Sequence, residues 1–505
     1  MVMPYPQDIQ CCGHRAWHWW RVVIVAVLLG LTGCAAVGPD YVPPTMALPE
    51  QWHSVSANAT GSPDLTVEEW WQCLKDPVLT RLIHDAMAGN LDIKEASFRV
   101  REARARRVQS AADQFPTLDA TGSAGRTGGS EQTGDGSTRT LYAVGFDAGW
   151  ELDLFGGVRR AKEAAQADLE AQIEDLNDVM VTLVAEVAVN YIDLRTYQAR
   201  LSVARRNVKA QQETWWLLDA LDRAGSGDAL AVAQARYNLE SSRATIPDLE
   251  AEQDAVMNRL AVLTGKPAGA LHDQLAQNRP IPHGSVDLAV GVPANVVRQR
   301  PDIRQAEREL AAQTARIGEA EADLYPKFSL SGSIGLEALH LGDLFSAGSR
   351  AWSMGPSFSW PVFDAGAIRS NIRVQEELTW QALTHYEATV LEALEEVENA
   401  MVAYAKEQHK LARLEAATDA ARSASRLAEH QYATGMIGFS DVLDAQRSLL
   451  TFEDQLAQSQ GTVMSDLVRL YKALGGGWQT VSHENNQNNK NNQYNQNKPD
   501  GEPVS

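Results

Sequence analysis

Side chains able to do chemistry occur along this sequence, but none of them has the spacing of a catalytic or metal-binding group. The 11 histidines are scattered, and none lies in a His-Glu-x-x-His pattern, which would place two zinc ligands on one face of a helix. The glycine-rich stretch 128–136 lacks the Lys-Ser/Thr pair of a phosphate-binding loop. The string Gly225-Ser226-Gly227 is followed by Asp228 and lacks the strand-to-helix setting of a hydrolase nucleophile. We therefore predict no catalytic residue, no metal site and no cofactor, and an enzyme is the least favoured interpretation.

Two carboxylates, Asp441 and Asp444, have a spacing that favours a different kind of chemistry. They lie three residues apart at the start of a predicted helix, so both side chains project from one side of its first turn. Several copies around an axis would form rings of negative charge, which attract cations and repel anions. The helix dipole alone also favours acidic residues in a first turn, so an ordinary solvated pair is the alternative.

The N-terminus predicts export and a lipid anchor. Arg15 and Arg21 precede an apolar run over 22–31, which is too short to cross a bilayer as a helix but suits the core of a signal peptide. The run ends in Leu31-Thr32-Gly33-Cys34, which resembles the lipobox of bacterial lipoproteins. This resemblance implies cleavage before Cys34 and attachment of lipid to that cysteine. An ordinary signal peptide with a coincidental cysteine is the alternative.

Composition excludes several classes of protein. The 505 residues are 44% hydrophobic and 22% charged, which is typical of a globular chain long enough for several cores. The formal charge of -20 leaves no basic surface for a phosphate backbone, so we expect no nucleic acid partner. Three of the four cysteines lie in or at the end of the leader, so a disulfide framework is excluded.

The body of the chain contains an internal repeat. Several short strings recur at a constant separation of 210 residues. They include Asp92-Ile93 with Asp302-Ile303, Trp150 with Trp360, Gly225 with Gly435, and Arg259-Leu260 with Arg469-Leu470. A constant separation over the whole body indicates two copies of one structural unit.

Each copy contains two stretches in which apolar and polar residues alternate, as in a β-strand with two different faces. The stretches are 117–124 and 142–153 in the first copy, and 328–334 and 352–360 in the second. Their length is roughly the 9–11 residues of a tilted membrane strand, and their hydroxyls and carboxylates suit a water-filled lumen. A soluble sheet with one face on a core is the alternative. The stretches 125–140 and 335–350 are expected to be long exposed loops.

The remainder of each copy is predicted to be helical. Residues 157–222 contain no proline and carry an apolar seam with a mean spacing near 3.5 residues, as in a coiled coil. A glycine-rich turn ends this helix, and Asp228 is expected to cap a second helix that runs to about residue 264. The second copy predicts a helix over about 366–432, a glycine turn, Ser440 as N-cap and a final helix.

The number of strands predicts an oligomer. Four strands per chain cannot close a membrane barrel, because the smallest known barrels have about eight. An open sheet edge in lipid would leave backbone groups unpaired. Arithmetic alone allows either a dimer or a trimer.

Four strings carry a resemblance to a known family. They are Trp-Glu-Leu-Asp-Leu-Phe-Gly at 150–156, Trp-Pro-Val-Phe-Asp at 360–364, Arg-Pro-Asp-Ile at 300–303, and Leu-Tyr-Lys-Ala-Leu-Gly-Gly-Gly-Trp at 470–478. Together with the tandem copies, they resemble the TolC-like outer membrane factor family of tripartite efflux systems, in its NodT-type lipoprotein branch. The resemblance covers roughly residues 34–480.

This resemblance implies an α+β membrane protein whose two tandem repeats give four transmembrane β-strands and long coiled-coil α-helices per chain. A homotrimer would form a 12-stranded β-barrel continuous with a 12-helix α-barrel. The implied function is a passive exit duct for small molecules, lipid-anchored in the outer membrane of a Gram-negative cell and extending into the periplasm. Its implied partners are a periplasmic adaptor (membrane fusion protein), an inner-membrane efflux pump and outer-membrane lipid. A lipid-anchored periplasmic coiled-coil adaptor or scaffold is the alternative.

These expectations divide the chain into six segments. They are a signal peptide with lipobox over 1–33, a lipid-anchored extended and equatorial segment over 34–87, the first repeat over 88–265, an equatorial linker over 266–301, the second repeat over 302–478, and a disordered Asn/Gln-rich tail over 479–505. Each repeat is expected to contain a helix, two strands and a helical hairpin. The tail lacks the apolar residues needed for a packed core.

The resemblance also implies roles for the hairpin turns. The family motif of Gly followed by Asp-Val-Leu-Asp matches Gly435 and 441–444, so Asp441, Asp444 and Tyr432 are expected to form a periplasmic gate. Ile437 stands where some relatives have a basic residue that locks the tip. The turns themselves are the expected adaptor-docking tips, comprising Gly225, Ser226, Gly227, Gly435, Met436, Ile437 and Gly438.

Overall fold

The computed structural model describes residues 36–53, 69–133, 136–284 and 299–478. They form two compact units, and each unit combines parts of both repeats. The strand unit comprises the described residues up to Pro44 and those of Arg101–Ala171 and Ala306–Tyr386. The hairpin unit comprises the described residues of Thr45–Val100 and Gln172–Gln305 and those from Glu387 onward. The leader with Cys34 and the tail over 479–505 lie outside the described residues.

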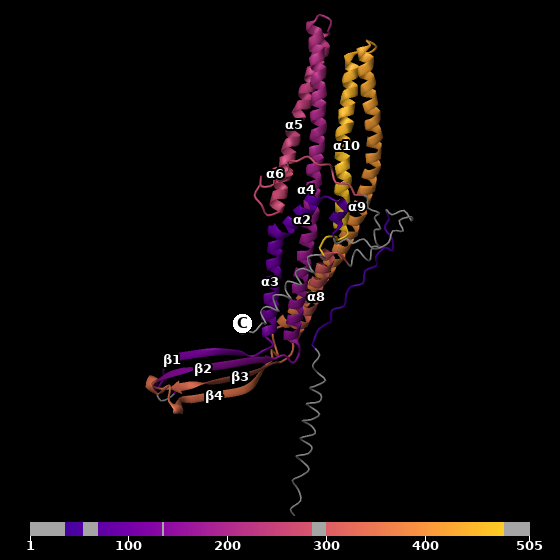
Figure 1. Ribbon diagram of the computed structural model, residues 1–505. Coiled ribbons are helices and arrows are strands. Elements are labelled where there is room, and N and C mark those ends of the chain that lie inside the picture. The colour runs from indigo at the N-terminus through magenta and orange to yellow at the C-terminus, as the bar shows by residue number, and fades with distance from the viewer. Residues whose placement is uncertain (1–35, 54–68, 134–135, 285–298, 479–505) are drawn as a thin grey trace, which may run out of the picture. The chain divides into compact units, whose positions relative to one another are not determined.

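The strand unit contains a four-stranded antiparallel sheet in the order β1-β2-β3-β4. The first repeat supplies β1 (Thr117–Gly128) and β2 (Thr138–Leu152), and the second supplies β3 (Lys327–Ala338) and β4 (Arg350–Ser359). Figure 1 shows the four strands side by side, with their connecting turns at one end. The register pairs Thr117 with Gly149, Tyr142 with Ala338, and Lys327 with Ser359.

The strands are longer at their turn ends than the sequence predicted. Pairing of β1 with β2 continues to Gly128 and Thr138, and β3 continues to Ala338. The connecting segments are therefore 129–137 and 339–349, and the expected loops over 125–140 and 335–350 were drawn too wide. Every residue of β1 is exposed, so its glycine, serine and threonine residues have no core to fill and extend the ladder without apolar side chains.

The register places apolar and polar residues on opposite faces of the sheet. One row across the strands consists of Leu118, Ala148, Gly332 and Met354, and the next row consists of Asp119, Asp147, Ser333 and Ser353. The apolar face is not covered within the described chain, since Met354 is 76% exposed and Trp352 is 78% exposed. This exposure contradicts the alternative of a soluble sheet packed on a core.

Two tryptophans fasten the sheet to the segment that follows the preceding helix, in the same way in both repeats. Trp150 Nε1 donates a hydrogen bond to the Gln114 carbonyl, and Trp360 Nε1 donates one to the Leu324 carbonyl, each at 3.0 Å. Donors and acceptors are both 210 residues apart. Trp360 lies just beyond β4, so it acts as an anchor at the strand end.

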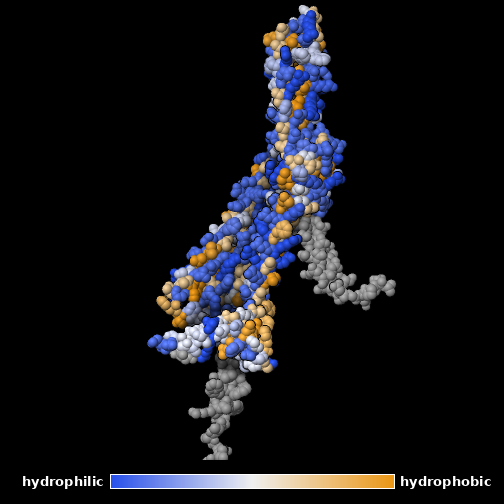
Figure 2. Space-filling view, turned by 90° about the vertical axis from the view of Figure 1, so that its left-hand side faces the viewer, coloured by the Kyte–Doolittle hydropathy of each residue, from blue (hydrophilic) through white to orange (hydrophobic). Residues whose placement is uncertain are grey.

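The helices follow the predicted pattern. α3 (Leu91–Ala112) and α8 (Pro301–Ala322) precede the strand pairs, and α4 (Gly157–Arg223) and α9 (Ala367–Ala433), of 67 residues each, follow them. α5 (Ala229–Leu263) and α10 (Phe439–Ala473), of 35 residues each, complete two helical hairpins. Figure 2 shows a largely hydrophilic helical surface with scattered hydrophobic patches. Among the described helices, none combines enough length with enough apolar character to cross a membrane.

The core of the hairpin unit lies where short elements pack on the hairpins. η1 (Trp70–Leu74) and α2 (Pro77–Gly89) contribute to one buried cluster with residues of α4, α5, α6 (His272–Leu275) and α10. Trp70 stacks on Tyr471 of α10 with ring centroids 5.2 Å apart. The cluster joins the two repeats through side chains that neither repeat could bury alone.

Candidate functional site

The turns at the ends of the two hairpins have the same backbone geometry. Gly225 and Gly435 have φ angles of 78° and 75°, in the left-handed region that glycine adopts without steric cost. The next residue in each turn donates its N–H to a carbonyl five residues earlier, Ser226 to Leu221 at 3.1 Å and Met436 to Gln431 at 2.9 Å. This pattern ends a helix and satisfies its last carbonyls.

The residues expected at these tips are available for contact. Gly225, Ser226 and Gly227 are exposed, as are Gly435, Met436 and Gly438, whereas Ile437 is half-buried. Ile437 packs against an apolar cluster inside the tip. Ile437 therefore contributes to packing inside the tip. At the position where some relatives have a basic residue that locks the tip, this chain has an apolar contact instead.

The second helix of each hairpin begins with a different cap. Asp228 caps α5 as predicted, because its carboxylate accepts the Leu230 N–H at 2.9 Å. The prediction of Ser440 as the cap of α10 is wrong, since the helix begins at Phe439 and its N-cap is Gly438. Asp441 Oδ2 accepts the Gly438 N–H at 3.2 Å, and the Asp441 N–H is donated to the Gly438 carbonyl at 3.2 Å. Asp441 supplies the carboxylate of this capping arrangement, so a hydroxyl at position 440 is not needed.

Asp441 and Asp444 lie on one exposed side of α10. Between them, Val442 and Leu443 are only 2% and 3% exposed. Their burial fixes the rotation of the helix about its axis, so that the two carboxylates face outward. Asp444 Oδ1 is 3.7 Å from Nη1 of Arg447, one turn further along. The structure thus brings the two predicted carboxylates together, and it gives each of them a local partner.

Tyr432 belongs to the apolar interior of the tip. Its ring lies 5.4 Å from that of Phe439, inclined at 58°. Both rings pack in a cluster that draws on both hairpins and includes Leu218, Ala231, Ala235, Ala428, Val442 and Leu443. Among the described residues, no hydrogen bond joins Tyr432 to Asp441 or Asp444, so its contribution is to hold the start of α10 in place.

Arg447 forms a link between the hairpins that sequence reasoning missed. From α10 its guanidinium donates to Asn238 Oδ1 on α5 at 3.0 Å and to the Tyr237 hydroxyl. It also lies over the Tyr237 ring, 5.2 Å from the centroid. The repeat could have predicted this contact, since Tyr237 and Arg447 are 210 residues apart and therefore occupy equivalent positions in the two copies. Repeat-related helices pack through such equivalent positions.

The Arg-Pro-Asp-Ile string forms a half-buried charge cluster in the hairpin unit. Arg300 donates to the Ala473 carbonyl at 2.6 Å and pairs with Asp302 at 2.7 Å and Glu396 at 2.8 Å. It therefore ties the start of α8 to α9 and to the end of α10. Burial, with the nearby charge of Asp302, raises the pKa of Asp178 to about 6. These contacts give the string a structural role.

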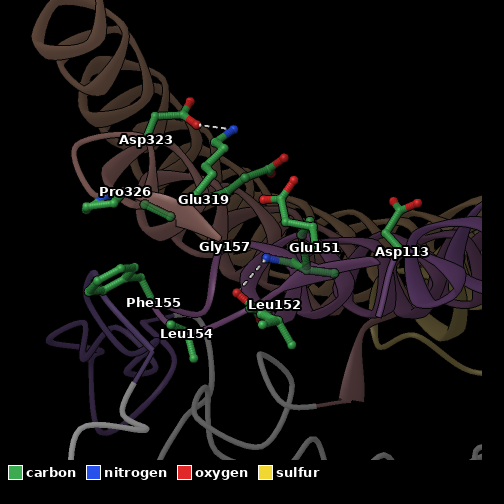
Figure 3. A pocket seen from close by; sticks show the side chains of 14 residues that line it. Asp113, Glu151, Leu152, Leu154, Phe155, Gly157, Glu319, Asp323 and Pro326 are labelled. Carbon is green, nitrogen blue, oxygen red and sulfur yellow. Dashed lines mark hydrogen bonds and ion pairs between the residues drawn. The ribbon is translucent and has the colours of Figure 1, made fainter. Parts of the chain in front are cut away.

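A cavity of about 300 Å³ lies in the strand unit at the helix ends of β2 and β3. Its charged lining residues are Asp113, Glu151, Asp153, Glu319, Asp323 and Lys327. Figure 3 shows the carboxylates of Glu151 and Glu319 near each other, and its dashed line at Asp323 marks the ion pair with the Lys327 ammonium. That pair is 2.9 Å long, and burial raises the pKa of Glu319. Throughout the described residues, no three His, Cys, Asp or Glu side chains are grouped to hold a metal ion.

Comparison with known proteins identifies the family. The model of the family described as "Outer membrane efflux protein" matches twice, over residues 82–266 and 292–476. The chain belongs to the outer membrane efflux protein family. The two matches begin 210 residues apart, which is the separation found between the repeated strings.

Relatives of the outer membrane efflux protein family match over nearly the whole chain. Nodulation protein T of Rhizobium leguminosarum bv. trifolii is 33% identical, over 90% of this chain and 96% of the relative. Cation efflux system protein CusC of Escherichia coli O6:H1 is 31% identical, over 91% of this chain and 99% of the relative. Among solved structures, the outer-membrane channel OprN has a TM-score of 0.82 at 38% identity, covering 88% of this chain and all of that one.

These matches establish the class of function. The chain is the outer membrane channel of a tripartite efflux system, it extends into the periplasm, and it is not an enzyme. The fold prediction is confirmed, since the chain has two family repeats, four strands and long helices. The alternative of a periplasmic adaptor is wrong, because the matching family and structures are channels.

Proposed function

We propose that three copies of this chain assemble into a closed exit duct, in which the four strands of each chain contribute to one 12-stranded barrel. Support comes from the sheet, which has one exposed apolar face and two edge strands, β1 and β4, without partners among the described strands. In lipid both edges must be paired, and pairing β4 of one chain with β1 of the next achieves this. The relatives are named for cation and for solvent efflux, so the duct is generic and the pump selects the cargo.

The oligomeric state is tested on the mature protein extracted from membranes in detergent. Native mass spectrometry of the purified protein is expected to give three chains per particle. A dimer or a monomer that conducts in bilayers would refute the trimer while leaving the family assignment intact.

We propose that Asp441 and Asp444 form the periplasmic gate, with Tyr432 holding the start of α10. Both carboxylates are exposed on one side of the helix, whereas the repeat-related positions hold Ala231 and Gln234. Three chains would bring six carboxylates into one constriction. Replacing both aspartates with alanine is expected to weaken cation preference and block by multivalent cations in planar bilayers. The matched control, Glu415→Ala with Asp419→Ala, removes two exposed charges from α9. Equal selectivity and block in all three proteins would contradict the gate.

We propose that the two hairpin turns dock a periplasmic adaptor, which an inner-membrane pump requires to reach the duct. The support is their exposure and their identical reversal geometry at Gly225 and Gly435. Photocrosslinkers at Ser226 and Met436 are expected to capture the adaptor in cells. A crosslinker at Ser130, between β1 and β2, serves as the control. Capture from position 130 alone would contradict docking at the turns.

We propose that the mature chain begins at lipidated Cys34, and that the segment boundaries follow the repeat, with 88–265 and 302–478 as its two copies. The Leu-Thr-Gly-Cys string supports the lipid, and the strings that recur 210 residues apart support the presence of two copies. Mass spectrometry of the N-terminal peptide is expected to show a diacylglyceryl group on Cys34. An unmodified peptide that starts at another residue would refute the anchor.

A further inference from the structure

The apolar face of the sheet carries only two charged residues, Arg126 and Arg350. The register assigns 25 residues of the four paired strands to this face, and these two arginines are the only charged side chains among them. The opposite face holds Asp119, Asp147 and Glu151 among other charges. Because charge on a lipid-facing strand is tolerated only near the membrane interface, the position of both arginines needs an explanation.

Both arginines lie at the turn ends of the strands. Arg126 is two residues from the end of β1 at Gly128, and Arg350 is the first residue of β4. Figure 1 shows the turn ends of the four strands together, opposite the ends that continue into helices. Since the helices extend into the periplasm, the turn ends face the outer leaflet. Both side chains are exposed, and neither has an ion pair or hydrogen bond with another described residue.

Aromatic residues mark the membrane interface beside the two arginines. Trp352 follows Arg350 by one pleat on the same face, and Tyr142 is one pleat from Thr140, which pairs with Arg126. Tryptophan and tyrosine concentrate at the level of the lipid headgroups. One pleat further out, a guanidinium reaches the level of headgroup phosphates, which it binds with two parallel hydrogen bonds.

The two arginines lie on the two edge strands, which are the strands that pair between neighbouring chains in the proposed trimer. β1 runs toward the turn end and β4 runs away from it, so β4 pairs antiparallel with β1 of the next chain. That pairing places Arg350 of one chain and Arg126 of its neighbour on the same outward face at the same rim. We propose that this junction binds a phosphorylated lipid of the outer leaflet, once at each of the three seams. The proposal rests on the trimer proposed above.

The test compares two lipids on the wild-type trimer. In native mass spectrometry, bisphosphorylated lipid A is expected to bind the purified protein at least about tenfold more tightly than the same lipid with both phosphates removed. Arg126→Gln with Arg350→Gln is expected to remove this difference. Arg139→Gln is the matched control, because Arg139 pairs with Thr127 at the same strand end but on the polar face, and it should bind like wild type.

Two results would overturn the inference. One is equal binding of both lipids to wild type, which is decisive even if the double variant fails to assemble. The other is unchanged lipid A binding by an assembled double variant. The same spectra report the number of chains, so a protein that is not a trimer refutes the proposed assembly, whereas a trimer without phosphate preference refutes only the lipid site.

Discussion

Replacing Arg447 with alanine is expected to loosen the two hairpin tips from each other and favour the open state of the proposed gate. The guanidinium is the polar bridge between α10 and α5 near the tip, through Asn238 and Tyr237. It also lies 3.7 Å from Asp444. The substitution therefore removes this link between the hairpins, while the Arg200–Asp454 pair between α4 and α10 remains. It also leaves Asp444 without its neighbouring positive charge.

The size of this effect follows from the contacts. Asn238 is only 5% exposed, so its carboxamide oxygen loses a charge-assisted hydrogen bond worth about 1.5–3 kcal/mol. Tyr237 is exposed, and its cation–π contact is worth about 0.5–1 kcal/mol. The sum is about 2–4 kcal/mol per chain. If opening breaks this link, Arg447→Ala shifts the equilibrium between joined and separated hairpins toward the separated state by about 30-fold or more relative to wild type.

Single-channel recording in planar bilayers tests this directly. The Arg447→Ala protein is expected to spend more time in its high-conductance state than wild type, with stronger preference for cations. Asn238→Ala should reproduce the opening without the change in preference, because Asp444 keeps Arg447 nearby. Open times and selectivity identical to wild type in Arg447→Ala would refute the link as a restraint on the gate.

Three further changes have expected outcomes, each measured as thermal stability of the detergent-solubilised oligomer. Asp178→Asn should stabilise the protein at pH 8 by up to about 3 kcal/mol and not at pH 4. The reason is that the pKa of Asp178 is raised from 3.8 to about 6 in the folded state, so the penalty for its charged form appears only as the pH rises through that window. Equal stabilisation at both pH values would contradict this. Gly145→Ala and Gly335→Ala should strongly destabilise the folded protein, since the added Cβ atoms would lie 2.7 Å and 2.6 Å, respectively, from cross-strand carbonyl oxygens. The control Gly125→Ala should be neutral, because a Cβ at that position has no neighbouring atom within 4 Å. Trp150→Phe and Trp360→Phe should each cost about 0.5–1.5 kcal/mol per chain through the lost hydrogen bond, whereas Trp380→Phe on the exposed surface of α9 should cost less.

The repeat and the helices were predictable because their signals are periodic. The seam predicted along the first long helix includes Leu183, Val187, Tyr191 and Leu194, and all four are buried at 4% or less. The strands were recognised from alternation, but their turn ends were not. There, exposed glycine and threonine residues pair in the ladder, and no apolar alternation distinguishes them from a loop. Local composition therefore fails where pairing with a neighbouring strand determines the structure.

Contacts between segments distant in sequence could not be predicted from local pattern. Arg447 was missed because its partners lie on another helix, and Asp178 gives no sign in the sequence that Arg300 and Asp302 will surround it. The cap of α10 shows a subtler failure. Ser440 is a preferred N-cap residue type, yet Asp441 can serve Gly438 from the third position of the helix, and α10 therefore starts two residues earlier than a Ser440 cap would allow.

Divergence between the two copies at the tips accounts for the charge of the proposed gate. Both hairpins share their turn geometry, yet Asp441, Asp444 and Arg447 of the second copy correspond to Ala231, Gln234 and Tyr237 of the first. Ala231 is buried in the tip cluster, so the first copy supplies an apolar support for the charged second copy. If the trimer holds, its six hairpins would alternate between support and gate, and charge would be confined to three of them. Breaking the three Arg447 links would then change the width and charge of the constriction, while the six turns keep their shape.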